Sequence, residues 1–347
     1  MADIDRIAAK IPVSLITGFL GCGKTTLISK LVLQPEMARA AVVINEIGEI
    51  GIDHELVTHS SENISVLANG CICCTIRTDL QESLRDLFGQ RRAGRIPDFD
   101  RVIVETTGLA DPAPIVQTLA SDDMLSNHYR LDGVVTLADA VNIHGQLRAH
   151  PEAVKQLALA DRILLSKGDL VTPVDLDAAK GEIQDINPHA QLLRCEMGDI
   201  SAHMLTGLNP STSRASADTL RFLGSSFETG EHTGSAYLGS RSGRHRDIDT
   251  LSLRFPDPFD WLRFNAAMDL IAALRGPDLL RMKGIVNIEG AAWVIQGVQH
   301  VFHPPVALDC WPTEDQTSRL VFITRGISES AINGVFAAVG AISKRQT

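Results

Sequence analysis

The chain has 347 residues, of which 44% are hydrophobic, and its formal net charge is −10 at pH 7. This length and hydrophobic content allow two packed cores, and the composition excludes an intrinsically disordered protein. The acidic balance argues against nucleic acid or an anionic membrane surface as the main partner, and no run of about 18 apolar residues is available to span a bilayer.

A glycine-rich loop follows the first predicted strand. Val13 to Thr17 is predicted to be a buried strand and Thr26 to Leu33 a helix, and Gly18 to Thr25 between them has the form G-x-x-x-x-G-K-[ST]. Glycines let backbone N–H groups turn toward a phosphate at a helix N-terminus. Lys24 would reach the β and γ phosphates and the Thr25 hydroxyl would bind Mg²⁺. We therefore expect a nucleotide-binding loop rather than an ordinary tight turn.

An acidic, glycine-containing segment follows the second predicted strand, Ala41 to Asn45. Residues 45–53 (NEIGEIGID) could order around the γ phosphate and Mg²⁺, with Glu46 near the reacting groups, and relax after hydrolysis. A solvated acidic loop is equally consistent with this composition.

Half of the six cysteines lie in four residues, Cys71-Ile72-Cys73-Cys74. They follow the predicted strand Ile64 to Leu67 and precede a predicted helix over about residues 79–90. Closely spaced thiolates near a helix N-terminus have lowered pKa values and bind soft metals. Three buried apolar cysteines or a redox dithiol are the alternatives. A fourth metal ligand is left open among Glu46, His59, a water molecule and a residue of a client protein.

The next predicted strand, Arg101 to Glu105, ends in an acid and is followed by Gly108. Such a strand end is suited to steering Mg²⁺ and its waters through Glu105 and to offering the Gly108 N–H to the γ phosphate. The other interpretation is an ordinary strand end.

Three further strands alternate with predicted helices: Gly133 to Ala138, Arg162 to Ser166 and Gln191 to Cys195. This alternation predicts an α/β fold with a mostly parallel sheet flanked by helices. After the run Ile163 to Leu165 comes Ser166-Lys167-Gly168-Asp169, which resembles the [NS]-K-x-D element of GTPases. The Asp169 carboxylate would accept two hydrogen bonds from guanine, while the Lys167 stem would lie along the base. Adenine lacks those donors.

The composition changes near Pro210, where Ser, Gly, Thr and Arg become frequent. We predict a P-loop domain over residues 1–209, a linker or mobile loop over 210–248 and a smaller α+β domain over 249–347. The elements predicted in this last domain are strands at Leu251–Phe255, Leu279–Ile288, Ala292–Val298 and Leu320–Ile323, and helices over about 258–274 and from Ser328.

Together, the segments GFLGCGKTT, NEIGEIGID, CICC, ETTGLADPAP and SKGD, with a smaller C-terminal domain, resemble the CobW-like family of metal-handling P-loop GTPases over nearly the whole chain. In that family the C-x-C-C cysteines bind zinc or cobalt, metal binding is coupled to nucleotide binding, and members act as metallochaperones or metal-insertion factors. The chain lacks a dense histidine tract, so no metal-storage tail is expected. The resemblance implies phosphate and Mg²⁺ ligands from Gly21 to Thr26, including Cys22 and Gly23, guanine contacts from Lys167 and Asp169, and metal ligands at Cys71, Cys73 and Cys74.

The expected function is that of a slow GTPase that uses GTP and Mg²⁺, carries Zn²⁺ or Co²⁺ and delivers it to a client metalloprotein in the cytoplasm, with no nucleic-acid or membrane partner. Oligomeric state is left open. One alternative is a regulatory GTPase switch with a structural zinc that acts through partner binding. A nucleotide or small-molecule kinase using the same loop is the second alternative, although no lid signature is present.

Overall fold

The computed structural model describes residues 9–44, 57–60, 64–67, 72–75, 80–209, 241–242 and 248–343. These residues divide into two compact units. The first comprises 9–182 and 190–209, and the second comprises 183–189 and the described residues from 241 onward. Residues 183–189, which lie inside the predicted P-loop domain, thus group with the C-terminal unit. Most of the predicted linker, residues 210–248, lies outside the described residues.

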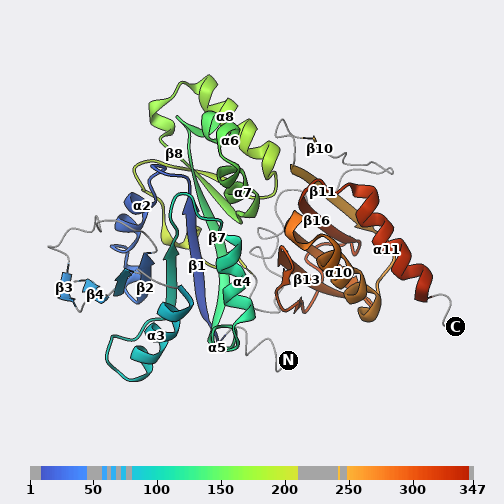
Figure 1. Ribbon diagram of the computed structural model, residues 1–347, viewed down its shortest axis with the longest axis horizontal. Coiled ribbons are helices and arrows are strands. Elements are labelled where there is room, and N and C mark those ends of the chain that lie inside the picture. Colours follow the sequence, from blue (N-terminus) through green and yellow to red (C-terminus); the bar gives the residue numbers. More distant parts are fainter. Residues whose placement is uncertain are drawn as a thin grey trace. The chain divides into compact units, whose positions relative to one another are not determined.

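The first unit is built on a nine-stranded sheet in which β1 lies between β6 and β7 (Figure 1). The strands from β5 to β9 in spatial order pair in parallel, whereas β3 and β4 add an antiparallel edge. The predicted parallel α/β sheet is confirmed. In spatial order the strands are β3 (Val57–Ser60), β4 (Ile64–Leu67), β5 (Ile72–Thr75), β2 (Ala40–Ile44), β6 (Arg101–Glu105), β1 (Ile11–Gly18), β7 (Tyr129–Asp139), β8 (Arg162–Ser166) and β9 (Gln191–Cys195).

The central strands are buried on both faces, which explains why they are continuous apolar runs. On β1, Ile16 belongs to a core cluster with Leu27 and Leu31 of the following helix. Leu15 points to the opposite face, because side chains alternate along a strand, and it is 0% exposed. Helices therefore cover the sheet from both sides.

Two helices of this unit, α4 and α5, begin beside an aspartate whose carboxylate accepts a hydrogen bond from the backbone of the first turn. Asp111 accepts a hydrogen bond from the Ala113 backbone N–H at 3.0 Å, and Asp122 accepts one from Leu125 at 2.8 Å. The helices are α2 (Lys24–Leu31), α3 (Leu80–Arg92), α4 (Ala113–Ser121), α5 (Asp123–His128), α6 (Ile143–Ala149), α7 (Pro151–Leu159) and α8 (Pro173–Ile186), with 3₁₀ turns at Pro35–Met37, Gly168–Leu170 and Ala202–Met204.

Two short strands differ from the sequence-based expectation. The prediction placed Cys73 and Cys74 between a strand and a helix, but both lie on β5, and β3 precedes the predicted strand β4. The physical reason is lateral pairing. The backbone of β5 pairs with β2 on one side and β4 on the other, and ICCT carries no alternating pattern that reveals such a partner in advance.

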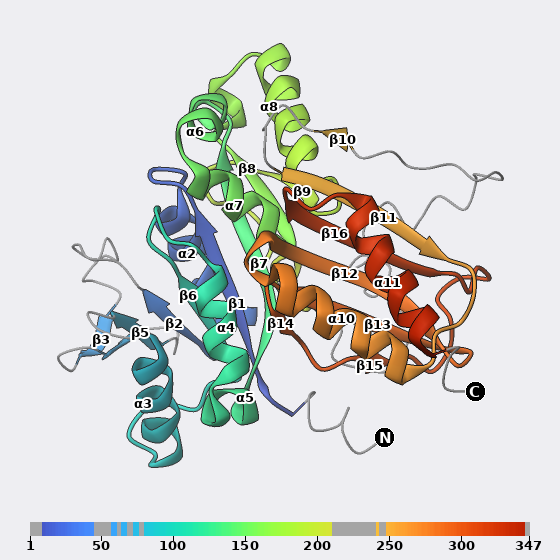
Figure 2. The ribbon, with the colours of Figure 1, turned by 45° about the vertical axis from the view of Figure 1, so that its right-hand side comes forward.

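The second unit is a mixed α+β domain, as predicted. Its seven-stranded sheet carries α10 (Trp261–Arg275) and α11 (Glu329–Ser343) side by side on one face (Figure 2). Phe264, Met268 and Ile332 from these helices pack on Phe322 and Val286 of the sheet. The strands are β10 (Arg241–Ser242), β11 (Ile248–Phe255), β16 (Ser318–Arg325), β12 (Leu279–Ile288), β13 (Ala291–Val298), β14 (Val301–Phe302) and β15 (Val306–Ala307), and Gly276–Asp278 forms a 3₁₀ turn.

Part of the predicted linker belongs to this sheet. Residues 241–242 form β10, which pairs antiparallel with β11, because β11 offers unpaired backbone groups along its outer edge. Within the described ranges, no helix is long and apolar enough to cross a membrane.

Candidate nucleotide and metal site

The glycine-rich loop connects β1 to α2 at the carboxyl edge of the sheet. Gly18, Gly21 and Gly23 have φ values of 142°, 73° and 101°, in the region that favours glycine. At Gly18 space is also limiting, because a Cβ there would stand 2.4 Å from the Leu137 carbonyl oxygen. The three glycines thus give the loop a backbone conformation that L side chains rarely adopt. This is the conformation that turns successive N–H groups toward an anion at a helix N-terminus.

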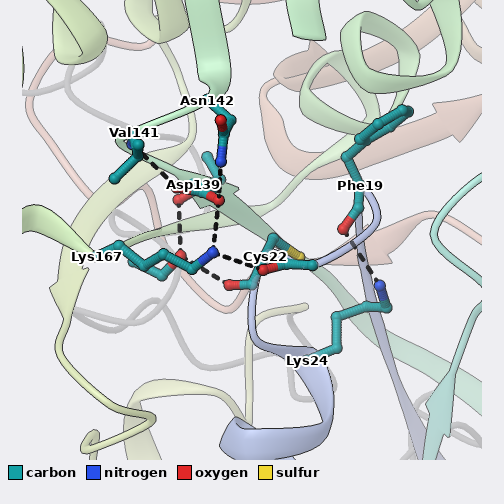
Figure 3. Close-up of polar contacts among 10 residues, drawn as sticks. Phe19, Cys22, Lys24, Asp139, Val141, Asn142 and Lys167 are labelled. Carbon is teal, nitrogen blue, oxygen red and sulfur yellow. Dashed lines mark hydrogen bonds and ion pairs between the residues drawn. The ribbon is translucent and has the colours of Figure 1, made fainter. Parts of the chain in front are cut away.

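Lys24, the first residue of α2, places its ammonium group over the loop. Its side chain is buried, and Nζ donates to the carbonyl oxygens of Gly18 at 2.9 Å and Phe19 at 3.4 Å (Figure 3). The positive charge is therefore held against the loop's own carbonyls. The adjoining Thr25 and Thr26 are exposed at the start of the helix.

Two oxygen donors meet beside this loop. The Thr25 hydroxyl donates to Oε1 of Glu105 at 3.2 Å, and Glu105 is 0% exposed at the carboxyl end of β6. Parallel pairing sets this arrangement, because Glu105 is in register with Ile16 of β1, just before the loop. A hydroxyl and a carboxylate are hard oxygen ligands of the type that Mg²⁺ prefers, so these residues fit the ion expected with a bound nucleotide.

The segment after β6 lies directly against the loop. A Cβ built on Gly108 would stand 2.6 Å from the backbone nitrogen of Leu20, so only glycine fits at this approach. Gln156 of α7, itself 1% exposed, holds the segment by donating from Nε2 to the carbonyl oxygens of Gly108 at 3.1 Å and Ala110 at 2.9 Å. Lys155 adds an ion pair with Asp111.

Sequence reasoning missed Gln156. The available signal was one amide among apolar residues on the buried face of α7, which otherwise carries Ala153, Val154 and Leu157. A buried amide requires hydrogen-bond partners, but only the folded chain shows that those partners are the carbonyls of Gly108 and Ala110.

The predicted base-recognition element reaches the same loop from β8. The Ser166 hydroxyl donates to the Cys22 carbonyl at 2.7 Å, and Lys167 Nζ donates to the Gly21 carbonyl at 2.8 Å (Figure 3). Asp169 follows, exposed, in the 3₁₀ turn Gly168–Leu170. The structure therefore brings Ser166 and Lys167 onto the phosphate loop and leaves the Asp169 carboxylate accessible next to them.

Cys22 has a different environment from a metal-binding cysteine. Its side chain is 0% exposed, and burial raises the pKa of its thiol, opposed by the nearby charge of Lys24. A protonated, enclosed thiol is a poor ligand and a poor nucleophile. The Cys22 side chain therefore fills space inside the loop.

The cysteine motif is only partly within the described residues. Cys71 and Glu46 lie outside them, and for Cys73, Cys74 and His59 only the strand placement is described. Among the residues that the structure describes, no group of three or more His, Cys, Asp or Glu side chains could hold a metal ion.

The strand β5 nevertheless places part of the motif in the same sheet as the glycine-rich loop, two strands away from β6. In the sheet, Ile44 of β2 is in register with Thr75 on one side and with Glu105 on the other. Two inter-strand steps of about 4.8 Å place the backbones of Thr75 and Glu105 about 10 Å apart. Cys74 immediately precedes Thr75 and pairs with Val43.

Comparisons with known proteins identify the family. Residues 12–194 match the CobW/HypB/UreG nucleotide-binding domain, and residues 248–339 match the cobalamin synthesis protein CobW C-terminal domain. The chain belongs to the CobW family of nucleotide-binding proteins, which confirms the resemblance of its motifs.

The similarity to individual family members extends over most of each chain. The chain is 32% identical to the zinc chaperone YjiA of Escherichia coli over 95% of this chain and 98% of that protein. It is 30% identical to the zinc chaperone CobW of Pseudomonas aeruginosa, covering 94% and 91% of the two chains. The zinc-regulated GTPase metalloprotein activator 1 of Schizosaccharomyces pombe is 30% identical, covering 87% and 78%. A crystal structure of the Zn(II)-bound YjiA GTPase from E. coli matches with a TM-score of 0.75 and 30% identity, covering 95% of this chain and 99% of that chain.

Proposed function

We propose that this protein is a GTP-hydrolysing zinc chaperone that carries Zn²⁺ on Cys71, Cys73 and Cys74 and delivers it to a client metalloprotein. The names of its relatives support the class, since they are zinc chaperones and a zinc-regulated GTPase metalloprotein activator. The observation that carries the proposal is the register row Thr75–Ile44–Glu105. It places the cysteine strand β5 two strands away from β6, whose last residue, Glu105, lies beside the phosphate loop.

The nucleotide half of the proposal assigns a role to each group at that edge. The loop N–H groups and Lys24 bind the phosphates, Gly108 offers its N–H to the γ phosphate, and Lys167 with Asp169 recognises guanine. Thr25 and Glu105 would hold Mg²⁺, which when bound neutralises charge on the phosphate oxygens. Because the Gly108 segment touches Leu20 of the loop, the presence of a γ phosphate is transmitted to β6 and its neighbours.

The metal half of the proposal rests on thiolate chemistry. Three cysteine thiolates suit a tetrahedral Zn²⁺ centre, and Co²⁺ can occupy the same ligands. In the proposed cycle, GTP orders the segments around the γ phosphate and brings the cysteines into coordinating geometry, and hydrolysis relaxes them and releases the ion to the client. Coupling of this kind typically changes affinity by about 5- to 150-fold.

A metal titration tests the cycle. Zn²⁺ affinity is measured against a competing chelator with GDP, with a nonhydrolysable GTP analogue and without nucleotide. We expect tighter Zn²⁺ binding in the analogue complex than in the GDP complex. Equal affinity in the two complexes would reject the carrier cycle. Zinc that stays bound in all three states would instead support the alternative, a regulatory GTPase with a structural zinc.

A further inference from the structure

Asp139 is a buried carboxylate at the nucleotide edge that no sequence motif singles out. It is the last residue of β7, is 1% exposed and is in register with Ser166 of β8. Its Oδ1 accepts the Val141 N–H at 2.9 Å, and its Oδ2 accepts from Asn142 Nδ2 at 2.8 Å and from Lys167 Nζ at 2.7 Å (Figure 3). The carboxylate is thus fixed by its own turn and presents one oxygen to Lys167.

Lys167 connects this carboxylate to the phosphate loop. The same Nζ that contacts Asp139 also donates to the Gly21 carbonyl at 2.8 Å. The backbone of Lys167 has φ 56° and ψ 25°, a left-handed conformation that is uncommon for a residue with a side chain. Both ends of this lysine are therefore held. The left-handed backbone turns the chain toward Asp169, and the ammonium group donates to Asp139 of β7 and to Gly21 of the loop.

The ion pair of Asp139 and Lys167 can hold the lysine side chain in one orientation. A charge-assisted hydrogen bond is shorter and stronger than a neutral one, and Asp139 is itself immobilised by two other donors. The Lys167 side chain retains 35% exposure, in contrast to the enclosed carboxylate. The side chain is thus partly accessible to a ligand, while its ammonium group is hydrogen-bonded to Asp139 and to the Gly21 carbonyl.

We propose that Asp139 is a positioning residue for guanine-nucleotide binding, which acts by holding Lys167 against the Gly21 carbonyl so that the lysine stem is aligned for the base. This inference rests only on the nucleotide-binding part of the proposed function and does not involve zinc. Asp139 is expected to contribute through Lys167 and not through contact with the nucleotide.

A double-mutant cycle on GDP affinity tests this, performed on the full chain without added zinc. Asp139→Asn replaces an acceptor oxygen with a donor facing Lys167 Nζ, and Lys167→Met keeps the stem but removes the ammonium. We expect each single variant to weaken GDP binding by about 10- to 100-fold. The double variant should bind no more weakly than Lys167→Met alone, because the second change removes an interaction that is already lost.

The control is a carboxylate matched in burial on the same strand. Asp132 is also 1% exposed and accepts from Arg130 and from the Gly207 N–H, but lies near the opposite end of β7. Asp132→Asn should lower the free energy of unfolding and leave GDP affinity within about twofold of the wild type, in line with additivity for distant sites.

Each of the following results would overturn the inference. The first is a wild-type GDP affinity in a folded Asp139→Asn variant. The second is a double variant whose loss of GDP affinity equals the product of the two single losses, because the two residues would then act independently. If Asp139→Asn does not fold, Asn142→Ala replaces it, since it removes one of the donors that hold Oδ2; about 2- to 10-fold weaker GDP binding is then expected, and unchanged binding would count against the role. A wild-type chain that binds no GDP would overturn the proposed function as well.

Discussion

Gly108 and Leu20 touch through their backbones: the space a Cβ would need on Gly108 is already taken by the nitrogen and Cα of Leu20, at 2.6 and 2.7 Å. Residues from two separate strand ends are thereby locked together at the phosphate loop. A change on either side must displace the other, since packed interiors deform little.

Replacing Gly108 with alanine should weaken the binding of GTP more than the binding of GDP. Gly108→Ala forces the segment or the loop to shift, so we expect a loss of stability of about 1–3 kcal/mol and about tenfold weaker binding of a nonhydrolysable GTP analogue, with GDP less affected. Nucleotide titration and urea unfolding measure the two effects. The control, Gly89→Ala in α3, meets open space and should stabilise by about 0.5–1 kcal/mol. An unchanged GTP-to-GDP affinity ratio in Gly108→Ala would contradict the proposed γ-phosphate contact.

Removing the Gln156 amide should also weaken GTP-analogue binding relative to GDP binding. Gln156→Leu keeps a similar volume but leaves two buried carbonyls without this donor, which costs about 1–3 kcal/mol of stability. Because those carbonyls belong to Gly108 and Ala110, we also expect selective weakening of GTP-analogue binding. The matched control is Gln34→Leu, since Gln34 likewise bridges two backbone groups, of Ile200 and Ala202. Gln34→Leu should lower the free energy of unfolding but leave the ratio of GTP-analogue to GDP affinity unchanged. Equal affinity ratios in the two variants would show that Gln156 is merely structural.

Asp169→Asn should change the base preference. The substitution exchanges an acceptor for a donor, so GDP affinity should fall by at least about a hundredfold while xanthosine diphosphate binds better. Competition titrations with the two diphosphates measure this directly. Asp177→Asn serves as the charge-matched control, because Asp177 is exposed and pairs with Lys180 on α8. GDP affinity that survives in Asp169→Asn would mean that another group recognises the base.

Removing one thiol of the motif should abolish tight zinc binding and spare the nucleotide site. For Cys73→Ser we expect bound zinc to fall well below the wild-type stoichiometry, because a neutral hydroxyl replaces a thiolate ligand, with GDP affinity unchanged. Elemental analysis after dialysis gives the stoichiometry. Cys310→Ser, at an exposed thiol outside the motif, is the control and should retain its zinc. Full zinc content in Cys73→Ser would eliminate the cluster as the carrier site.

Much of the fold was predictable because its strands are local apolar runs. The strands Ile64–Leu67, Arg101–Glu105 and Arg162–Ser166 have the bounds predicted from sequence. In contrast, β5 was missed because its four residues carry no periodic pattern and are a strand only through their neighbours β2 and β4. Local pattern reports burial, whereas lateral pairing depends on segments elsewhere in the chain.

The amino-acid sequence by itself determined that this chain has a phosphate-loop motif and a cysteine cluster, and it predicted a base-recognition element, because each is a contiguous motif whose chemistry depends on residue types at fixed spacing. Only the tertiary structure decided which other groups serve these motifs. Asp139 meets Lys167 across 28 positions and Gln156 meets Gly108 across 48. Neither pair has a sequence signature, because parallel strands and their crossover helices bring together residues that are distant along the chain.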